Sequence, residues 1–239
     1  MDPTDQAIQE VGKTARHYLD QILVAPLSEL GRLFQDKIYF RRIENRVKTI
    51  AKLRETIKEM KIDPKNLDRL DNADVVIELL EQSSHSGDEA VAELFAGILA
   101  SSFAPETAHL VHPSYAATLG QISPVDARIL AFCMLVARDS EKKDKLANPS
   151  EIGIDSVMIH PSFTLTTNDV VSQLGLSNEI AVFSVANLAR LGVFEASWDY
   201  TQLDAEYPIS FTRYGYLLLK RCTENLTDEK LKSAASQQN

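Results

Sequence analysis

The chain has 239 residues, of which 44% are hydrophobic, so it can bury a sizeable core and does not belong to the disordered class. Its formal net charge of −9 opposes nonspecific attraction of the whole molecule to nucleic acid or anionic lipid. The acidic start MDPTDQAIQEVG differs from a secretory signal, and no stretch reaches the roughly 18 to 20 apolar residues that span a bilayer. We therefore expect a cytoplasmic protein without transmembrane insertion.

The first 137 residues are predicted to form an N-terminal helical bundle, because apolar residues recur there at three- and four-residue steps. The central helix should begin at a cap provided by Ser86 or Asp88 and end before Pro105. Ser123-Pro124 is a typical helix start, with serine as the cap and proline at the first position. The other helices of this part are expected over residues 5–23, 27–34, 43–60, 73–81 and 114–121.

The helix over 43–60 lies in an unusually basic segment. Residues 32–65 contain 11 Lys and Arg against 5 Asp and Glu, a net charge of +6, whereas the rest of the chain carries −15. Such a surface suits phosphate groups, lipid headgroups or an acidic protein partner. It is also typical of a solvated helix face whose charges pair locally. The candidate binding surface consists of five cations, Arg41, Arg42, Arg46, Lys48 and Lys52.

The remainder of the chain is divided into three parts. Residues 138–160 are polar and predict a loop or linker, and 226–239 predict a polar tail. Between them, residues 161–225 predict a C-terminal winged-helix-like module. Its order is a helix over 168–174, a turn, a helix over 178–191, two strands in VFEASWDY and YPISF, and a closing helix capped by Thr212. The expected fold class is therefore mainly α.

A winged helix is a common DNA-binding module, but this sequence does not favour that use. The second helix, SNEIAVFSVANLARL, has Arg190 as its only cation, and residues 161–239 carry 6 Lys and Arg against 9 Asp and Glu. Such a balance is poor for neutralising phosphates, so protein docking or a structural role is favoured.

Catalytic, cofactor and metal sites are not predicted. The chain contains no GxSxG, P-loop, GxGxxG or HExxH motif, and we therefore assign no catalytic residue and no cofactor. His109, His112 and Glu106 lie close together in sequence, but Pro113 interrupts a shared helix and no further ligand follows at metal-binding spacing. A loop histidine that bonds to the backbone is the favoured interpretation. Cys133 and Cys222 are expected to be buried free thiols of a reducing compartment.

Five blocks follow one another along the chain: APLSELGRLFQDKIYFRRIENRVKTIAKLRE, GDEAVAELFAGILASSF, HPSYAATLGQISPVDARIL, VANLARLGVF and FTRYGYLLLKRC. In this order they resemble the bacterial abortive infection alpha family. The resemblance covers most of the chain. It implies a cytoplasmic bacterial protein of phage defence, in which infected cells stop growing or die before phage are released. It implies no catalytic residues.

The first hypothesis is thus a non-catalytic interaction or sensor protein of abortive infection, with a protein partner from phage or host. The second is a transcriptional regulator that binds nucleic acid through the winged helix or the basic helix. The third is a toxin enzyme, activated by infection, whose site the sequence does not identify. Self-association into a homo-oligomer is compatible with each of them.

Overall fold

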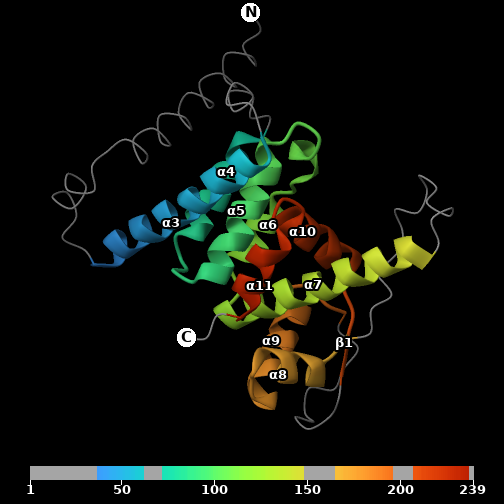
Figure 1. Cartoon of the computed structure of the whole chain (residues 1–239). Coiled ribbons are helices and arrows are strands. Elements are labelled where there is room, and N and C mark those ends of the chain that lie inside the picture. Colours follow the sequence, from blue (N-terminus) through green and yellow to red (C-terminus); the bar gives the residue numbers. More distant parts are fainter. Residues whose placement is uncertain (1–36, 62–71, 148–164, 196–206, 237–239) are drawn as a thin grey trace, which may run out of the picture. The chain divides into compact units, whose positions relative to one another are not determined.

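The computed structural model describes residues 37–61, 72–147, 165–195 and 207–236 (Figure 1). Over these ranges the protein contains nine α-helices, a short 3-10 helix and a two-stranded sheet, which confirms the mainly α class. None of the helices in these ranges is long and apolar enough to cross a membrane. The helices predicted over 5–23 and 27–34 lie outside the described residues. The chain divides into two compact units, Met1–Gln121 and Ile122–Asn239.

The first unit is organised around one buried helix. Its elements are α3 (Lys37–Glu59), α4 (Ala73–Ser83), α5 (Glu89–Phe103), the 3-10 helix η2 (Ala108–Leu110) and α6 (Ser114–Leu119). Every residue of α5 after its first is buried, and α3, α4, α6 and η2 all pack against it (Figure 1). A helix that is apolar on all sides is stable only when it is covered in this way.

The ends of α5 follow the sequence signals. Asp88 is the N-cap, and its side chain accepts a hydrogen bond from the backbone N–H of Val91 at 3.1 Å. The helix ends at Phe103, because Ala104 is extended and precedes Pro105. Both predicted boundaries of the central helix are therefore confirmed, with Asp88 rather than Ser86 as the capping residue.

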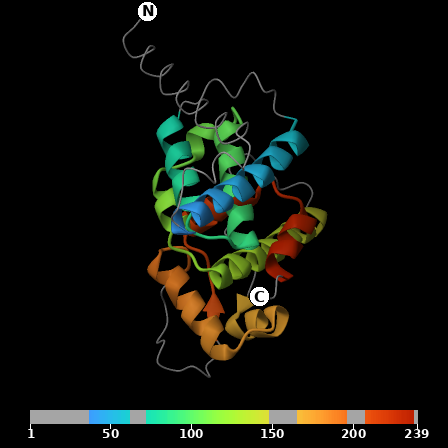
Figure 2. The same cartoon turned by 90° about the vertical axis from the view of Figure 1, so that its left-hand side faces the viewer.

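The second unit is built on α7. Its elements are α7 (Pro124–Ala147), β1 (Leu165–Thr166), α8 (Thr167–Leu174), α9 (Asn178–Arg190), β2 (Pro208–Ile209), α10 (Arg213–Thr223) and α11 (Asp228–Ser236). Helix α7 contacts α8, α9, α10 and α11, and α8 packs against α9 (Figure 2). The buried residues of α7 include Ile129, Leu130 and Cys133, which lie on the side that these helices cover.

The two helices predicted around residue 175 are present with the expected turn. Thr166 caps α8 and forms a capping box with Asp169. Gly175 ends α8 with a φ of 64°, a left-handed conformation that glycine adopts without strain. Ser177 then caps α9 by accepting a hydrogen bond from Ile180 N–H. The helix–turn–helix spacing is thus confirmed.

The predicted strand pair appears in shortened form. Within the described residues, Phe194 and Phe211 form an isolated antiparallel bridge, and β2 pairs with β1 in the register Leu165 with Ile209. The pairing with β1 was not predicted. Residues 196–206, which should join the two strands, lie outside the described residues.

Two secondary-structure predictions are wrong. Helix α7 continues to Ala147, so 138–147 do not form a loop. The segment EKKDK contains good helix formers, and no proline follows before Pro149. Residues 228–236 of the predicted polar tail form α11, because Leu231 and its neighbours Ala234 and Ala235 are buried. The division of the chain into the predicted domains remains a proposal.

Partly buried polar bonds connect α7 to α11 and to the segment before it. Arg138 on α7 donates hydrogen bonds to the Leu226 carbonyl at 3.0 Å and to Asp228 Oδ1 at 2.9 Å. The thiols of Cys133 and Cys222 are buried and unbonded to each other, as the sequence predicted. Burial raises the pKa of both thiols far above the ordinary value, so they stay protonated and unreactive at neutral pH.

Candidate interaction surfaces

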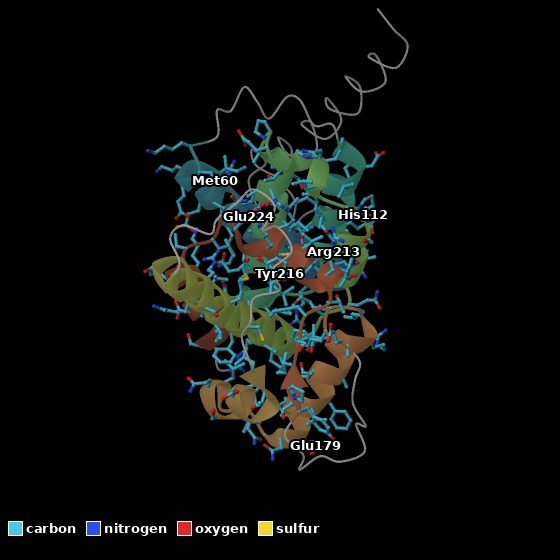
Figure 3. The ribbon with its side chains drawn as sticks, turned by 90° about the vertical axis from the view of Figure 1, so that its right-hand side faces the viewer. Met60, His112, Glu179, Arg213, Tyr216 and Glu224 are labelled. Atoms are coloured by element: carbon cyan, nitrogen blue, oxygen red, sulfur yellow. The ribbon has the colours of Figure 1, made fainter. Side chains whose placement is uncertain are left out.

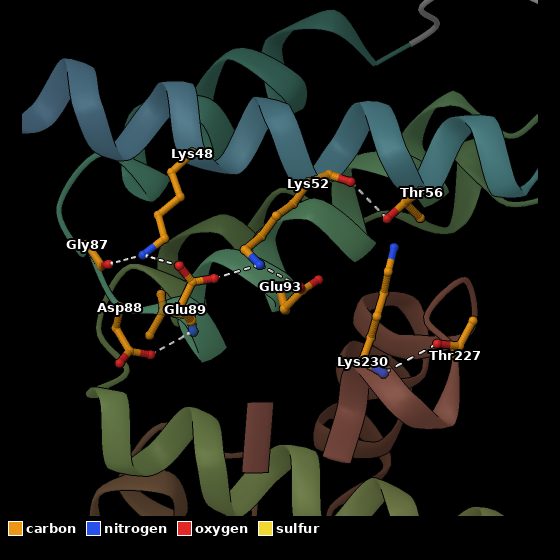
Figure 4. Close-up of polar contacts among 10 residues, drawn as sticks. Lys48, Lys52, Thr56, Gly87, Asp88, Glu89, Glu93, Thr227 and Lys230 are labelled. Carbon is orange, nitrogen blue, oxygen red and sulfur yellow. Dashed lines mark hydrogen bonds and ion pairs between the residues drawn. The ribbon is translucent and has the colours of Figure 1, made fainter. Parts of the chain in front are cut away.

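The five predicted cations lie on α3 but do not share one environment. Arg41 and Arg42 are exposed near the beginning of the described part of the helix. Arg46 is half-buried, and within the part of the chain that the structure describes its buried Nε has no hydrogen-bond partner. Lys48 and Lys52 point toward α5, where they meet carboxylates (Figure 4). The structure therefore separates the arginines of the candidate surface from the lysines.

Lys48 and Lys52 form an ion-pair network with the first two turns of α5. Lys48 Nζ lies 2.6 Å from Glu89 Oε1 and donates a hydrogen bond to the Gly87 carbonyl at 2.7 Å. Lys52 Nζ lies 2.7 Å from Glu89 Oε2 and 2.6 Å from Glu93 Oε1 (Figure 4). Glu89 bridges the two lysines, so the four charges compensate one another within the unit.

The protonation states of the network follow from this geometry. Burial alone would lower the pKa of Lys52, but hydrogen bonds and attraction from Glu89 and Glu93 outweigh it, and the pKa is raised. Burial alone would raise the pKa of Glu89, but hydrogen bonds from Lys48 and Lys52 outweigh it, and the pKa is lowered. Both groups are therefore held in their charged forms at neutral pH.

The position of the network is set by local structure. Glu89 occupies the first turn of α5 next to the Asp88 cap, where the partial positive charge of the helix N-terminus favours carboxylates. Asn45 of α3 donates a hydrogen bond to the Ser84 carbonyl at 2.9 Å and fixes the segment before α5. Since Asn45, Lys48 and Lys52 meet successive positions in 84–93, α3 and α5 run in the same direction along this contact.

The sequence expectation of local pairing within α3 missed these acids. Lys48 and Lys52 are four residues apart, and so are Glu89 and Glu93. Equal spacing on two helices is a signal for pairing across a contact. It becomes informative only once α3 and α5 are known to be neighbours, which the sequence did not indicate.

A second surface lies on α9 and was not predicted as a site. Phe183 is 61% exposed and Ile180 is 47% exposed, although both are large apolar residues. Glu179 and Arg190, near the two ends of the helix, are also exposed, and Ala186 is half-buried. We name these five residues the α9 face. The sequence did contain a signal for this surface, because α9 has apolar residues on both of its sides. Val182, Val185 and Leu188 form its buried side, which leaves Ile180 and Phe183 exposed on the other.

A buried carboxylate supports one end of the α9 face. Asp126 is 1% exposed and completes the capping box of α7, because it accepts a hydrogen bond from Ser123 N–H at 2.7 Å while Ser123 Oγ accepts one from Asp126 N–H at 3.1 Å. It also accepts hydrogen bonds from Ser184 Oγ and, at 2.8 Å, from Asn187 Nδ2. Asn187 Oδ1 in turn accepts from Arg190 Nη2 at 2.9 Å. The Arg190 guanidinium is thus oriented through Asn187 by a buried group.

The histidines near residue 110 do not assemble a metal site. His109 is exposed, and His112 Nδ1 lies 2.8 Å from Ser114 Oγ and accepts a hydrogen bond from Ser114 N–H at 3.2 Å. Within the described residues, no group of three His, Cys, Asp or Glu side chains is placed to hold a metal ion. His112 therefore bonds to the backbone of the helix that follows it, as a loop histidine was predicted to do.

Fold and surfaces together define a mainly α-helical protein with a charged helix contact in its first unit and an exposed apolar helix face in its second. The chain belongs to the abortive infection alpha family, whose family model matches residues 44–234. The family resemblance seen in the sequence is therefore confirmed, and it connects the protein with abortive infection. Comparison with curated proteins and with solved structures found no significant match.

Proposed function

We propose that the protein is a non-catalytic interaction or sensor protein of phage defence that recognises a protein partner in the cytoplasm. Family membership supplies the link to abortive infection. The observation that carries the mode of action is the exposure of Phe183 and Ile180 on α9. Large aromatic and aliphatic side chains exposed together on one helix face are typical of a protein-binding surface.

We further propose that residues 161–225 form a winged-helix-like module and that residues 1–137 form a helical bundle. The order β1, α8, α9, Phe194, β2 supports the module, because two helices are followed by a chain segment that returns to pair with β1. In such a module α9 takes the place of the recognition helix. Its outward side should then be the side that meets a ligand.

The chemistry of the α9 face favours a protein over nucleic acid as that ligand. A helix that enters a DNA groove presents cations and amides to phosphates and bases. Here the exposed centre is apolar, and Glu179 would repel phosphates at the N-terminal end, where a helix otherwise attracts them. Burying Phe183 against another protein removes apolar area from water and stabilises the complex.

The cations of α3 provide a second surface in this proposal. Arg41 and Arg42 are exposed, and an acidic segment of a partner could pair with them. Lys48 and Lys52 contribute less, because an incoming anion must compete with Glu89 and Glu93. We therefore narrow the candidate surface to its arginine end.

A phage-infection assay tests the proposal. Cells carrying the intact protein, Phe183→Ser, Ile77→Ser or the double variant Arg41→Ala/Arg42→Ala are compared for plating efficiency and survival after infection. Ile77 on α4 is 42% exposed, so its replacement removes an apolar side chain of similar exposure elsewhere. We expect Phe183→Ser to abolish protection and Ile77→Ser to retain it. Full protection by a folded Phe183→Ser protein would refute the role of the α9 face.

A further inference from the structure

Four residues of the α9 face form a stripe with opposite charges at its two ends. Glu179, Phe183, Ala186 and Arg190 follow one another at steps of four, three and four residues, which places them on one side of an α-helix. The stripe begins with an acid, has an apolar centre and ends with a base. Glu179 lies in the first turn of α9 and is labelled in Figure 3. When this order is laid against the same order running in the opposite direction, each acid meets a base and the apolar centres meet each other.

We propose that the α9 face binds the α9 face of a second copy of this chain, with the two helices antiparallel about a two-fold axis. This proposal rests on the proposed function, since it names the partner of the same surface. With the axis passing between positions 184 and 185, Glu179 of each copy lies opposite Arg190 of the other. Phe183 of each copy then lies opposite Ala186 of the other. A two-fold contact requires this kind of self-complementarity.

The charges support antiparallel pairing and oppose parallel pairing. In the antiparallel arrangement the two ends of the contact each bring a carboxylate to a guanidinium. A parallel arrangement would instead place Glu179 against Glu179 and Arg190 against Arg190. Both like-charge pairs would be repulsive, so the charges of the stripe favour the antiparallel arrangement of the two copies.

Arg190 is positioned in advance for this contact. Its Nε and Nη2 donate to Asn187 Oδ1 at 3.2 and 2.9 Å, and Asn187 is held by the buried Asp126. These bonds use two of the five N–H donors of the guanidinium and leave others to meet a carboxylate. A side chain that is already ordered loses less conformational entropy on binding.

The centre of the stripe fits in size as well as in polarity. Phe183 projects from the helix with 61% of its surface exposed, and the opposing residue is the small Ala186. A large side chain over a small one lets two helix backbones approach closely, and Ile180 adds apolar area beside the contact. Two helices of 13 residues nevertheless bury less than the about 1,200 Å² of a standard interface. We therefore expect a weak dimer, with a Kd of about 10 to 100 µM.

Charge reversal at the two ends provides the test. Analytical ultracentrifugation of the full chain, over about a thousandfold range of concentration around the expected Kd, measures self-association. Glu179→Arg leaves two cations on the face, and Arg190→Glu leaves two carboxylates. Each variant alone should dimerise at least about tenfold more weakly than the unmodified protein, because both ends become repulsive. An equimolar mixture of the two variants should form a heterodimer, because both ends become attractive again.

The apolar centre provides a second, independent measurement. Phe183→Ser should weaken the dimer about 100-fold, because the aromatic ring is lost twice in each dimer. Ile77→Ser, on a different helix, should leave the dimer unchanged. Circular dichroism of each variant establishes that the helices are retained. A chain that stays monomeric over the whole range, or charge variants that fail to pair with each other while folded, would overturn the proposal.

The results separate this proposal from the proposed function. If the chain is monomeric but Phe183→Ser abolishes protection against phage, the second-copy proposal fails and the α9 face still recognises another protein. If Phe183→Ser breaks the dimer but leaves protection intact, the dimer contact stands and the proposed function of the face fails.

Discussion

Replacement of Lys52 should destabilise the first unit strongly, because its partner Glu93 is buried. Glu93 is 8% exposed, its Oε1 lies 2.6 Å from Lys52 Nζ, and its Oε2 has no hydrogen-bond partner among the described residues. Lys52→Met would leave this carboxylate without a counterion. Removing one member of a buried ion pair costs about 3 to 5 kcal/mol. Since the Lys52 side chain is 19% exposed and its other partner Glu89 is 40% exposed, we expect a loss of about 2 to 4 kcal/mol.

Urea denaturation followed by circular dichroism measures the loss. With a urea dependence of about 2 kcal/mol per molar, in the middle of the range for small proteins, the midpoint should fall by about 1 to 2 M. Lys48→Met is the matched control, because the same chemical change removes a lysine whose pair with Glu89 is 32% and 40% exposed. Its cost should stay below about 1 kcal/mol.

A double variant tests the reasoning about burial itself. Lys52→Met combined with Glu93→Leu removes both charges and replaces them with apolar side chains, which is often neutral or stabilising at a buried pair. The double variant should therefore recover most of the stability lost in Lys52→Met. If Lys52→Met costs no more than Lys48→Met, or if Glu93→Leu adds a further loss, the description of Glu93 as a buried charge that depends on Lys52 is wrong.

Two further predictions concern pH and backbone packing. The pKa of Glu89 is lowered, so its contribution to stability is fully present above the ordinary pKa of 4.5 and is lost as pH falls through the lowered value. Glu89→Gln removes this contribution and should therefore make stability depend less on pH at acidic pH. Urea titration at several pH values measures this dependence. In Gly215→Ala the added Cβ would collide with the backbone of Val193, at a cost of about 3 kcal/mol, and the melting temperature should fall by about 6 to 12 °C. Gly175→Ala is the control, because its Cβ would meet open space and only the positive φ causes strain. Equal shifts for the two glycine variants in a thermal melt would contradict the packing argument.

Helix positions were predictable wherever a local signal was strong. The cap at Asp88, the Ser123-Pro124 start and Gly175 are short-range features, and the structure has helix boundaries at each of them. The prediction failed where a polar segment gains its stability from distant contacts. Helix α11 is such a case, because Arg138, 90 residues earlier, bonds to Asp228. Its sequence is mostly polar, and Leu231, Ala234 and Ala235 are too few and mostly too small to give a strong local indication of burial.

The candidate site was predictable in its residues but not in their environment. Charge counting located the basic segment of α3, and that segment is a helix as expected. Counting cannot tell an exposed cation from a paired one. Lys52 and Glu93 are 41 residues apart and meet only because α3 and α5 are neighbours. The α9 face was missed for a related reason, since which apolar side of a short helix is covered depends on α7 and α8.

The lysines of α3 and the α9 face differ in the interactions that a ligand must break to bind there. This difference favours the α9 face as a recognition surface. An anion that reaches Lys48 and Lys52 must displace Glu89 and Glu93, leaving a buried carboxylate uncompensated, so recognition there is coupled to loosening of α3 from α5. Contact at Phe183, which is 61% exposed, removes apolar area from water and displaces no carboxylate of the described residues. Arg41 and Arg42 resemble the second case, because they are exposed. We therefore expect the lysines to stabilise the fold, and we propose the α9 face and the arginine end of α3 as the recognition surfaces.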